Sequence, residues 1–304
     1  MSLSVQPIKV HFNITKRWER PFYTGSLWRG LFGHSLKTVS CMTNADTCHG
    51  CPLTANCSYY RVFEPKGQVF AQQNSKPPPP YVINPPAPDA PLHMEPGDPF
   101  TLEMNLLGQQ AIEQLPIIFS AWKMACKMPI ANSGNPFALQ AIEWLDLEGK
   151  SLGVAHTPHE LSMLRGAEPP QLNQDSNQLD LHLVTPLRMR VQKRYLQVSD
   201  LTAESLIKAL LRRTHLLETA YGQAQDLPDE WQTGLESLRV KKDLRWVDWQ
   251  RWSNRQNQHM KLGGLMGHVS VSGDLQAYLP ALKLLPWVNL GKNCSFGLGR
   301  IVIR

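Results

Sequence analysis

Four of the six cysteines crowd into one short segment near the N-terminus, at Cys41, Cys48, Cys51 and Cys57. Four thiolates within 17 residues can close a tetrahedral metal site, because short turns direct their sulfurs inward. The CxxC core is the strong element, whereas the outer spacings are looser than those of a common zinc finger. The segment therefore predicts a structural zinc site, with an iron–sulfur cluster or reduced, redox-active thiols as alternatives. No further ligand is implied, so we do not expect a catalytic metal.

A second chemical feature is the glycine-rich stretch near the C-terminus, where Gly291, Gly297 and Gly299 surround Lys292 and Ser295. Glycines allow backbone N–H groups to approach a phosphate closely, and a lysine adds positive charge. The spacing differs from that of a nucleotide-binding P-loop. The stretch predicts a phosphate-contacting loop, and the alternative is a tight hairpin before a final strand at 300–304.

Basic residues gather in two segments. Residues 181–199 carry no acid and four bases, namely Arg188, Arg190, Lys193 and Arg194. Residues 239–255 carry six bases, including Arg251 and Arg255, against two acids, and they interleave Trp246, Trp249 and Trp252. Cations beside aromatic faces suit single-stranded RNA. The alternative is a helix whose charged face is solvated and whose tryptophans are buried in the core. We favour burial in the core for the tryptophans and nucleic-acid binding for the charged residues.

One histidine stands out among ten as a candidate for proton transfer. His34 lies on a predicted helix, with Lys37 one turn later and Tyr23 just before the helix. Imidazole titrates near neutral pH, and the lysine and tyrosine would stabilise negative charge on a phosphate. His259 and His268 are the alternatives. The sequence lacks the motifs of serine hydrolases, HExxH metalloproteases and dinucleotide-binding proteins.

The composition limits the class of protein. The chain has 304 residues, a net charge of +6, 42% hydrophobic residues and 18% charged residues, which excludes disorder of the whole chain. No run approaches the ~18 apolar residues of a transmembrane helix. The N-terminus lacks the basic and apolar regions of a secretory signal, and the cysteines are not spread as in a secreted disulfide scaffold. We therefore expect a cytoplasmic protein without a membrane partner.

Hydrophobic periodicity predicts the same kind of organisation in both halves of the chain. The first half reads as a strand at 5–14, a helix at 24–40, strands at 81–83, 100–107 and 137–147, and a helix at 109–126. Residues 76–99 hold 10 of the 24 prolines and predict an extended surface connection. The second half reads as strands at 181–187 and 266–272 and helices at 201–221 and 275–285. This predicts an α+β fold with domains at 1–175 and 176–304.

Taken together, these segments resemble the CRISPR-associated endoribonucleases that process precursor CRISPR RNA, in the RAMP superfamily. The resemblance rests on an ordered set of pieces: Gly25–Lys37, the cysteines of 41–57, Tyr59–Pro65, Thr185–Arg188, Arg251–Gln256, Leu262–Gly267 and Gly291–Gly299. The cysteine-bearing form is similar to members found with type III CRISPR systems. The resemblance implies two tandem ferredoxin-like (RRM-like) domains, with the four-cysteine metal site inserted in the first.

The resemblance also implies an activity. It implies metal-independent cleavage of CRISPR repeat RNA by attack of a 2′-OH on the adjacent phosphate, which leaves a 2′,3′-cyclic phosphate and a 5′-OH. His34 would act as general base or acid, Lys37 as charge stabiliser and Tyr23 as orienting group. The expected partners are repeat RNA and the mature guide RNA, effector or adaptation proteins, and a second copy in a homodimer. The alternative is a catalytically inactive RAMP-type subunit that binds RNA in an effector or adaptation complex.

Overall fold

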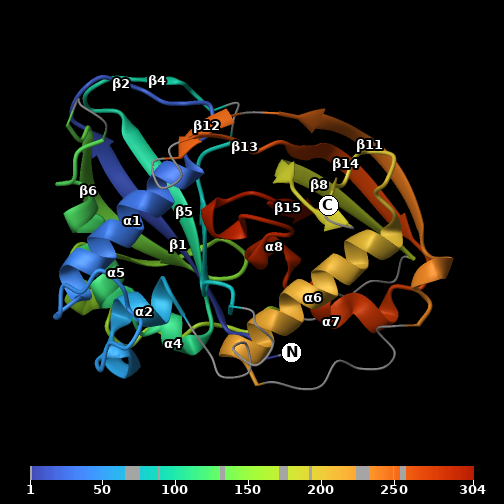
Figure 1. Ribbon diagram of the computed structural model, residues 1–304, viewed down its shortest axis with the longest axis horizontal. Helices are drawn as coiled ribbons and strands as arrows, with labels where there is room; N and C mark the ends of the chain where they lie inside the picture. The colour runs from blue at the N-terminus through green and yellow to red at the C-terminus, as the bar shows by residue number, and fades with distance from the viewer. Residues whose placement is uncertain are drawn as a thin grey trace. The chain divides into compact units, whose positions relative to one another are not determined.

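The structure is a computed structural model that describes residues 2–65, 76–87, 90–130, 134–170, 177–191, 194–223, 233–248, 250–253 and 258–304. It is a mixed α+β fold with antiparallel sheets, and it divides into two compact units (Figure 1). The N-terminal unit comprises Ser2–Pro169 together with Leu216–Gln223, and the C-terminal unit comprises Pro170–His215 and Ala224–Arg304. The predicted boundary at 175 lies outside the described residues. The sequence did not predict that Leu216–Gln223 would group with the N-terminal unit.

A five-stranded sheet with the order β3-β5-β1-β6-β7 forms the N-terminal unit, and each neighbouring pair is antiparallel. Its strands are β1 (Val5–Ile14), β3 (Tyr81–Asn84), β5 (Pro99–Leu107), β6 (Phe137–Leu145) and β7 (Ser151–Ala155). A separate two-stranded ribbon pairs β2 (Trp18–Glu19) with β4 (His93–Met94).

The proline-rich segment is more than a surface connection, so that part of the prediction is wrong. Tyr81, Val82 and Ile83 are fully buried, and β3 pairs with β5 at one edge of the sheet. The prolines at 77–80 keep the preceding chain extended, and the apolar residues that follow are then buried against the sheet. Residues 88–89 of the segment lie outside the described part.

Helices α1 (Gly25–Ser40) and α5 (Leu115–Ala125) pack against this sheet around an aromatic core. Phe12 of β1 stacks on Trp28 of α1 with ring centroids 5.5 Å apart, and it meets the edge of Trp122 of α5 at 6.1 Å. The predicted helix at 109–126 is divided into α4 (Gln109–Ile112) and α5, because Pro116 occupies the first turn of α5. The short α2 (Ser58–Val62) follows the cysteines.

The C-terminal unit contains a four-stranded antiparallel sheet with the order β11-β14-β8-β15. Its strands are β8 (Gln178–Leu187), β11 (Arg239–Val247), β14 (Gly264–Ser272) and β15 (Ile301–Ile303). Leucines dominate its core, which is covered by α6 (Ala203–Tyr221), α7 (Leu279–Leu282) and α8 (Leu285–Val288). The predicted helix at 275–285 is broken because Pro280 and Pro286 each begin a new short helix.

The described parts of the basic, tryptophan-containing segment form strands, so the helical interpretation of 239–255 is wrong there, while Trp249 lies outside the described residues. Arg239–Val247 is β11, and β12 (Gln250–Ser253) pairs with β13 (Gln258–Lys261) in a ribbon. Three-residue spacing of tryptophans suggested a helix, but the half-buried Val240 and Leu244 lie an even number of residues apart among exposed neighbours, which fits the period of a strand. Trp246 packs partly against the C-terminal core.

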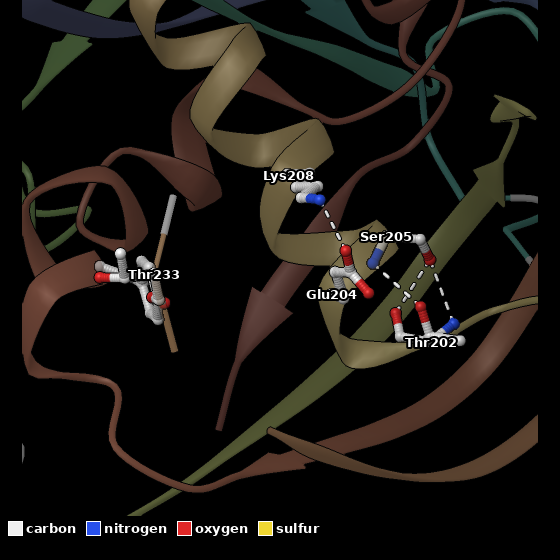
Figure 2. Close-up of polar contacts among 6 residues, drawn as sticks. Thr202, Glu204, Ser205, Lys208 and Thr233 are labelled. Carbon is white, nitrogen blue, oxygen red and sulfur yellow. Dashed lines mark hydrogen bonds and ion pairs between the residues drawn. The ribbon is translucent and has the colours of Figure 1, made fainter. Parts of the chain in front are cut away.

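The long helix α6 begins with a reciprocal cap (Figure 2). The Thr202 backbone N–H donates to Ser205 Oγ (3.1 Å), and the Ser205 N–H donates to Thr202 Oγ1 (3.0 Å). In the first turns Lys208 donates to the Glu204 carboxylate, with 2.6 Å between the atoms. These contacts satisfy amides that a helix start leaves unpaired, and they fix where α6 begins.

The main elements of the two units follow one chain order. In the N-terminal unit it runs β1, α1, β3, β5, α5, β6, and in the C-terminal unit β8, α6, β11, β14, α8, β15. If the edge strand β7 is set aside, β1 and β5 are the two central strands of the N-terminal sheet, and β8 and β14 are the two central strands of the C-terminal sheet. This is the order of a β-α-β-β-α-β ferredoxin-like motif. None of the described helices combines the length and apolar character that crossing a bilayer requires.

Candidate nucleic-acid interface

The glycine loop, Gly291–Gly299, connects α8 to β15 and rests on the end of β8. The buried Thr185 hydroxyl of β8 donates to the Gly297 carbonyl (2.6 Å) and accepts from the Arg300 N–H (2.8 Å). The Gly299 N–H donates to the Pro186 carbonyl (3.0 Å), and the Lys292 N–H donates to the Arg188 carbonyl (2.7 Å). The hairpin interpretation is therefore wrong, because the loop follows a helix and joins a strand that pairs with β8.

Close approach of backbone explains two of the glycines. A methyl group on Gly291 would lie 2.5 Å from the Arg188 carbonyl oxygen, and one on Gly299 would lie 1.7 Å from the Leu290 carbonyl oxygen. Both residues also have a positive φ, of 91° and 69°. Several loop amides thus bind the protein's own carbonyls, and the exposed Lys292 side chain is left to supply charge. Ser295 is half-buried in the single turn Cys294–Phe296.

A small basic hairpin lies beside the loop. Arg188 follows β8 and bridges to Gly291, and the ribbon of β9 (Arg190–Val191) and β10 (Arg194–Tyr195) comes next. The guanidinium carbons of Arg188 and Arg190 lie 4.1 and 4.6 Å from the centroid of the Tyr195 ring. Tyr195, which the sequence analysis missed, therefore holds two predicted RNA-binding arginines together by cation–π contact. Its position next to Arg194 was the available signal.

The structure brings some predicted RNA-binding residues together and leaves others undescribed. Arg190 and Arg194 share the hairpin, while the buried Arg188 precedes it, accepts from the Lys292 N–H through its carbonyl and bridges to Gly291. Lys193 and Arg255 lie outside the described residues. Arg251 belongs to β12, whose side chains lie outside the described part, as does that of His259.

His34 is exposed on α1, in the third turn of the helix. Gly30 precedes it by one turn, and a methyl group at Gly30 would meet no atom within 4 Å. Residues four apart share a helix face, so open space adjoins His34. A substrate backbone could approach the imidazole from that side.

The two proposed helpers of His34 do not gather around it. The Lys37 ammonium donates to the Ala45 carbonyl (2.8 Å) and the Asp46 carbonyl (3.5 Å), which attaches it to the cysteine segment. Tyr23 precedes α1, and His34 lies nine residues after Gly25, about 14 Å along the helix axis. Tyr23 and His34 are thus at different places along the helix, and the three side chains do not surround one point.

The four cysteines line one small pocket in the cysteine segment, Cys41–Cys57, with a volume of about 100 Å³. The thiols of Cys41 and Cys51 approach the Thr43 hydroxyl at 3.7 and 3.9 Å, while Cys48 and Cys57 pack partly against the N-terminal core. The Thr43 contact lowers the pKa of Cys41, and burial raises the pKa of Cys48. Over the described ranges, no three His, Cys, Asp or Glu side chains are placed closely enough to hold a metal ion.

Comparison with protein-family models gives one match for each half. Residues 3–167 match AF_1859_N, described as an N-terminal domain. Residues 181–301 match the model of the CRISPR-associated endoribonuclease Cas6. No curated protein matches the chain significantly.

Solved structures with similar folds are also described as Cas6. A chain of a partial Cas6-RT-Cas1–Cas2 complex has a TM-score of 0.58 and 14% identity. The superposition covers 100% of the present chain but only 46% of that longer chain. A Cas6 product complex has a TM-score of 0.57 and 15% identity, with 99% of both chains covered. Thermus thermophilus Cas6 has a TM-score of 0.55 and 15% identity over 100% of both chains. At these identities the similarity shows the fold alone.

Proposed function

Because residues 181–301 match the family model of the CRISPR-associated endoribonuclease Cas6, we propose that the chain is a Cas6-type endoribonuclease that cleaves CRISPR repeat RNA into guide RNA. The observation that carries this proposal is the basic hairpin beside the glycine loop, where the exposed Arg190, Arg194 and Lys292 lie near the end of β8 and the buried Arg188 stacks on Tyr195. Phosphate binding needs such a cluster of cations. The shared strand order also supports two tandem ferredoxin-like domains, with the cysteine segment inserted in the first.

The chemistry we propose needs no metal. A base removes the proton of the 2′-OH, the 2′ oxygen attacks the adjacent phosphorus, and the bond from phosphorus to the 5′ oxygen breaks. An acid protonates the departing oxygen, which leaves a 2′,3′-cyclic phosphate and a 5′-OH. A side chain that titrates near pH 7 and cations that stabilise the transition-state charge are sufficient for this reaction.

His34 is the residue that we propose moves a proton. Its exposure and the open space above Gly30 support this role. Lys37 would stabilise phosphate charge from the next turn, but only after exchanging its two carbonyl acceptors for the substrate. Tyr23 would orient RNA at the start of α1, away from His34.

A cleavage assay tests the proposal. The protein is incubated with its repeat RNA in excess EDTA, and a matched RNA carries a 2′-deoxy sugar at the cut. We expect one cut in the first RNA and none in the second. His34→Ala should abolish cleavage and preserve affinity, while the control Thr38→Ala, one turn further on the same exposed face, should cut normally. Normal cutting by His34→Ala would exclude His34 from the mechanism, and His268 and His259 would then be mutated in the same assay.

The second candidate function is that of an inactive RNA-binding subunit. One observation favours it: Lys37 is engaged and Tyr23 is distant, so the proposed catalytic side chains are not assembled at one point. Tight binding of repeat RNA with no cut in either substrate would establish this function. The similar structure described as a Cas6-RT-Cas1–Cas2 complex supports adaptation proteins as partners in either case. A homodimer, effector proteins and a cytoplasmic location stay predictions.

For the cysteine segment we propose one structural zinc ion bound by Cys41, Cys48, Cys51 and Cys57. The support is that all four line one pocket, that a cysteine-rich donor set suits zinc, and that Thr43 already draws two of the sulfurs to one place. The thiols must move inward to complete the tetrahedron. Four-thiolate coordination closes the ion to substrate, so its role is structural.

Elemental analysis of the purified protein tests the metal. We expect about one equivalent of zinc per chain, which Cys48→Ser should lose. About four equivalents of iron with visible absorption would replace zinc by an iron–sulfur cluster. Less than a tenth of an equivalent of either metal would contradict the proposal.

A further inference from the structure

Two histidines from distant parts of the chain stack on each other in the C-terminal sheet. His182 of β8 and His268 of β14 are direct cross-strand neighbours, and their rings are 4.4 Å apart and inclined by only 9°. Both strands are central in the four-stranded sheet (Figure 1). His268 is one of the catalytic alternatives predicted from the sequence, whereas His182 was not predicted.

The pair lies on the face of the sheet opposite the leucine core, here called the open face. Leu181 and Leu183, which flank His182, are buried, and Val269 beside His268 is buried as well. Since side chains alternate along a strand, the two histidines point away from the core. His268 is exposed and His182 is half-buried.

A cavity of about 370 Å³ adjoins the stacked rings, within the size range of small-ligand sites. It forms where the register of β14 shifts between Leu265 and Gly267. Gly267 has a φ of 125°, and a methyl group on it would lie 2.2 Å from the Asp243 carbonyl oxygen. The bulge therefore requires glycine at this position, and Asp243 and Arg245 of β11 line the cavity beside the rings.

The surroundings of His182 favour its uncharged ring. Arg304 Nη2 lies 3.5 Å from His182 Nδ1, so this nitrogen can only accept a hydrogen bond. Burial, the neighbouring His268 and Arg304 all lower the pKa of His182, which keeps its ring neutral at pH 7. Arg245 and Lys241 lie on the same face of β11 and add positive charge near the rings.

We infer that His182 and His268 form a platform on which a base of single-stranded RNA stacks. Stacking on histidine, and on residues of the central strands of a four-stranded sheet, is a general mode of single-strand recognition. The Asp243 carboxylate is placed to accept a hydrogen bond from an exocyclic amino group, so cytosine should bind better than uracil, which lacks one. This inference rests on the proposed function, because it assigns a second contact to the same RNA.

The test uses the full chain and a cytidine trinucleotide as the probe, followed by NMR of the histidine rings. Stacking shifts the ring protons of His182 and His268 upfield, and we expect a smaller shift with a uridine trinucleotide. His268→Phe serves to assign the signals and should keep affinity within about threefold. His268→Ala should weaken binding about 5- to 100-fold. Val302→Ala, a control on the same row of the open face, should change nothing.

The outcomes separate this inference from the proposed function. Cleavage of repeat RNA with unshifted histidine rings would overturn the platform alone, and shifted rings in a protein that neither cuts nor binds repeat RNA would overturn the proposed function alone. Loss of cleavage in both His268→Ala and His268→Phe, with trinucleotide binding intact, would make His268 catalytic and also overturn the platform.

Discussion

The glycine loop and the cysteine segment are the two loops that carry the clearest chemical patterns, and they are held in opposite ways. The glycine loop is bonded to β8 through Thr185, Pro186 and Arg188, about a hundred positions away in the chain. The described hydrogen bonds of the cysteine segment join residues no more than nine positions apart, from Lys37 to Arg61.

This difference indicates what each loop needs. Long-range backbone bonds to a buried strand form together with the core, so the fold itself shapes the glycine loop. Local bonds between exposed residues contribute little once the ordering entropy is counted. The cysteine segment therefore needs an additional constraint, which a metal ion would supply.

The largest loss of stability is expected from Gly299→Ala in the glycine loop. The added methyl group would lie 1.7 Å from the Leu290 carbonyl oxygen at a positive φ, so the loop must leave β8. We expect a loss of about 4 kcal/mol in the free energy of unfolding, measured by denaturant titration. The control Gly30→Ala has open space in the middle of α1 and should gain up to about 1 kcal/mol. Equal stability of the two variants would contradict the conclusion that the fold itself shapes the glycine loop.

Removal of the metal should have the next largest effect. Cys48→Ser, or chelation of the wild-type protein, should cost about 3 kcal/mol if zinc orders the segment. Protease cleavage within 41–57 should accelerate, while RNA affinity of the glycine loop and hairpin should remain. Cys126→Ser, which changes a cysteine outside the segment, is the control for the thiol. An unaltered cleavage pattern after chelation would show that the segment is ordered without metal.

A smaller effect is expected from Thr185→Val, which preserves side-chain shape and removes the hydroxyl. The Gly297 carbonyl and the Arg300 N–H would both lose their partner in a site where Thr185 is only 2% exposed. Such a loss costs about 2 kcal/mol, and RNA affinity should fall with it as the loop loosens. Thr38→Val, whose hydroxyl bonds only the His34 carbonyl on an exposed face, should change stability by less than about 0.5 kcal/mol.

The smallest effect should come from Lys37→Met, which keeps the aliphatic stem and removes the ammonium. Two carbonyls of the cysteine segment lose their donor, which should cost about 1 kcal/mol in thermal unfolding. Lys208→Met on α6 removes only an exposed pair with Glu204 and should cost less than about 0.5 kcal/mol. A sharp drop in RNA cleavage without a change in melting temperature would instead support Lys37 as the charge stabiliser.

The sequence by itself determined the local features. The spacing of apolar residues predicted β1, α1, α6 and most strands of both sheets, with β7 and β11 as the exceptions, because the periods of helix and strand are properties of consecutive residues. His34 was likewise placed on a helix from the sequence, and it lies on α1; its exposure was found only in the structure. Glycine at 291 and 299 marked a loop that only glycine permits.

Only the tertiary structure decided which residues meet. It stacked His182 on His268, placed Arg188 and Arg190 against the Tyr195 ring and left Tyr23 apart from His34. It also turned a tryptophan pattern with apparent helical spacing into β11, since pairing with β14 outweighs weak local preference. Strand order and register bring distant residues together, and neither can be deduced from the spacing of neighbouring residues along the chain.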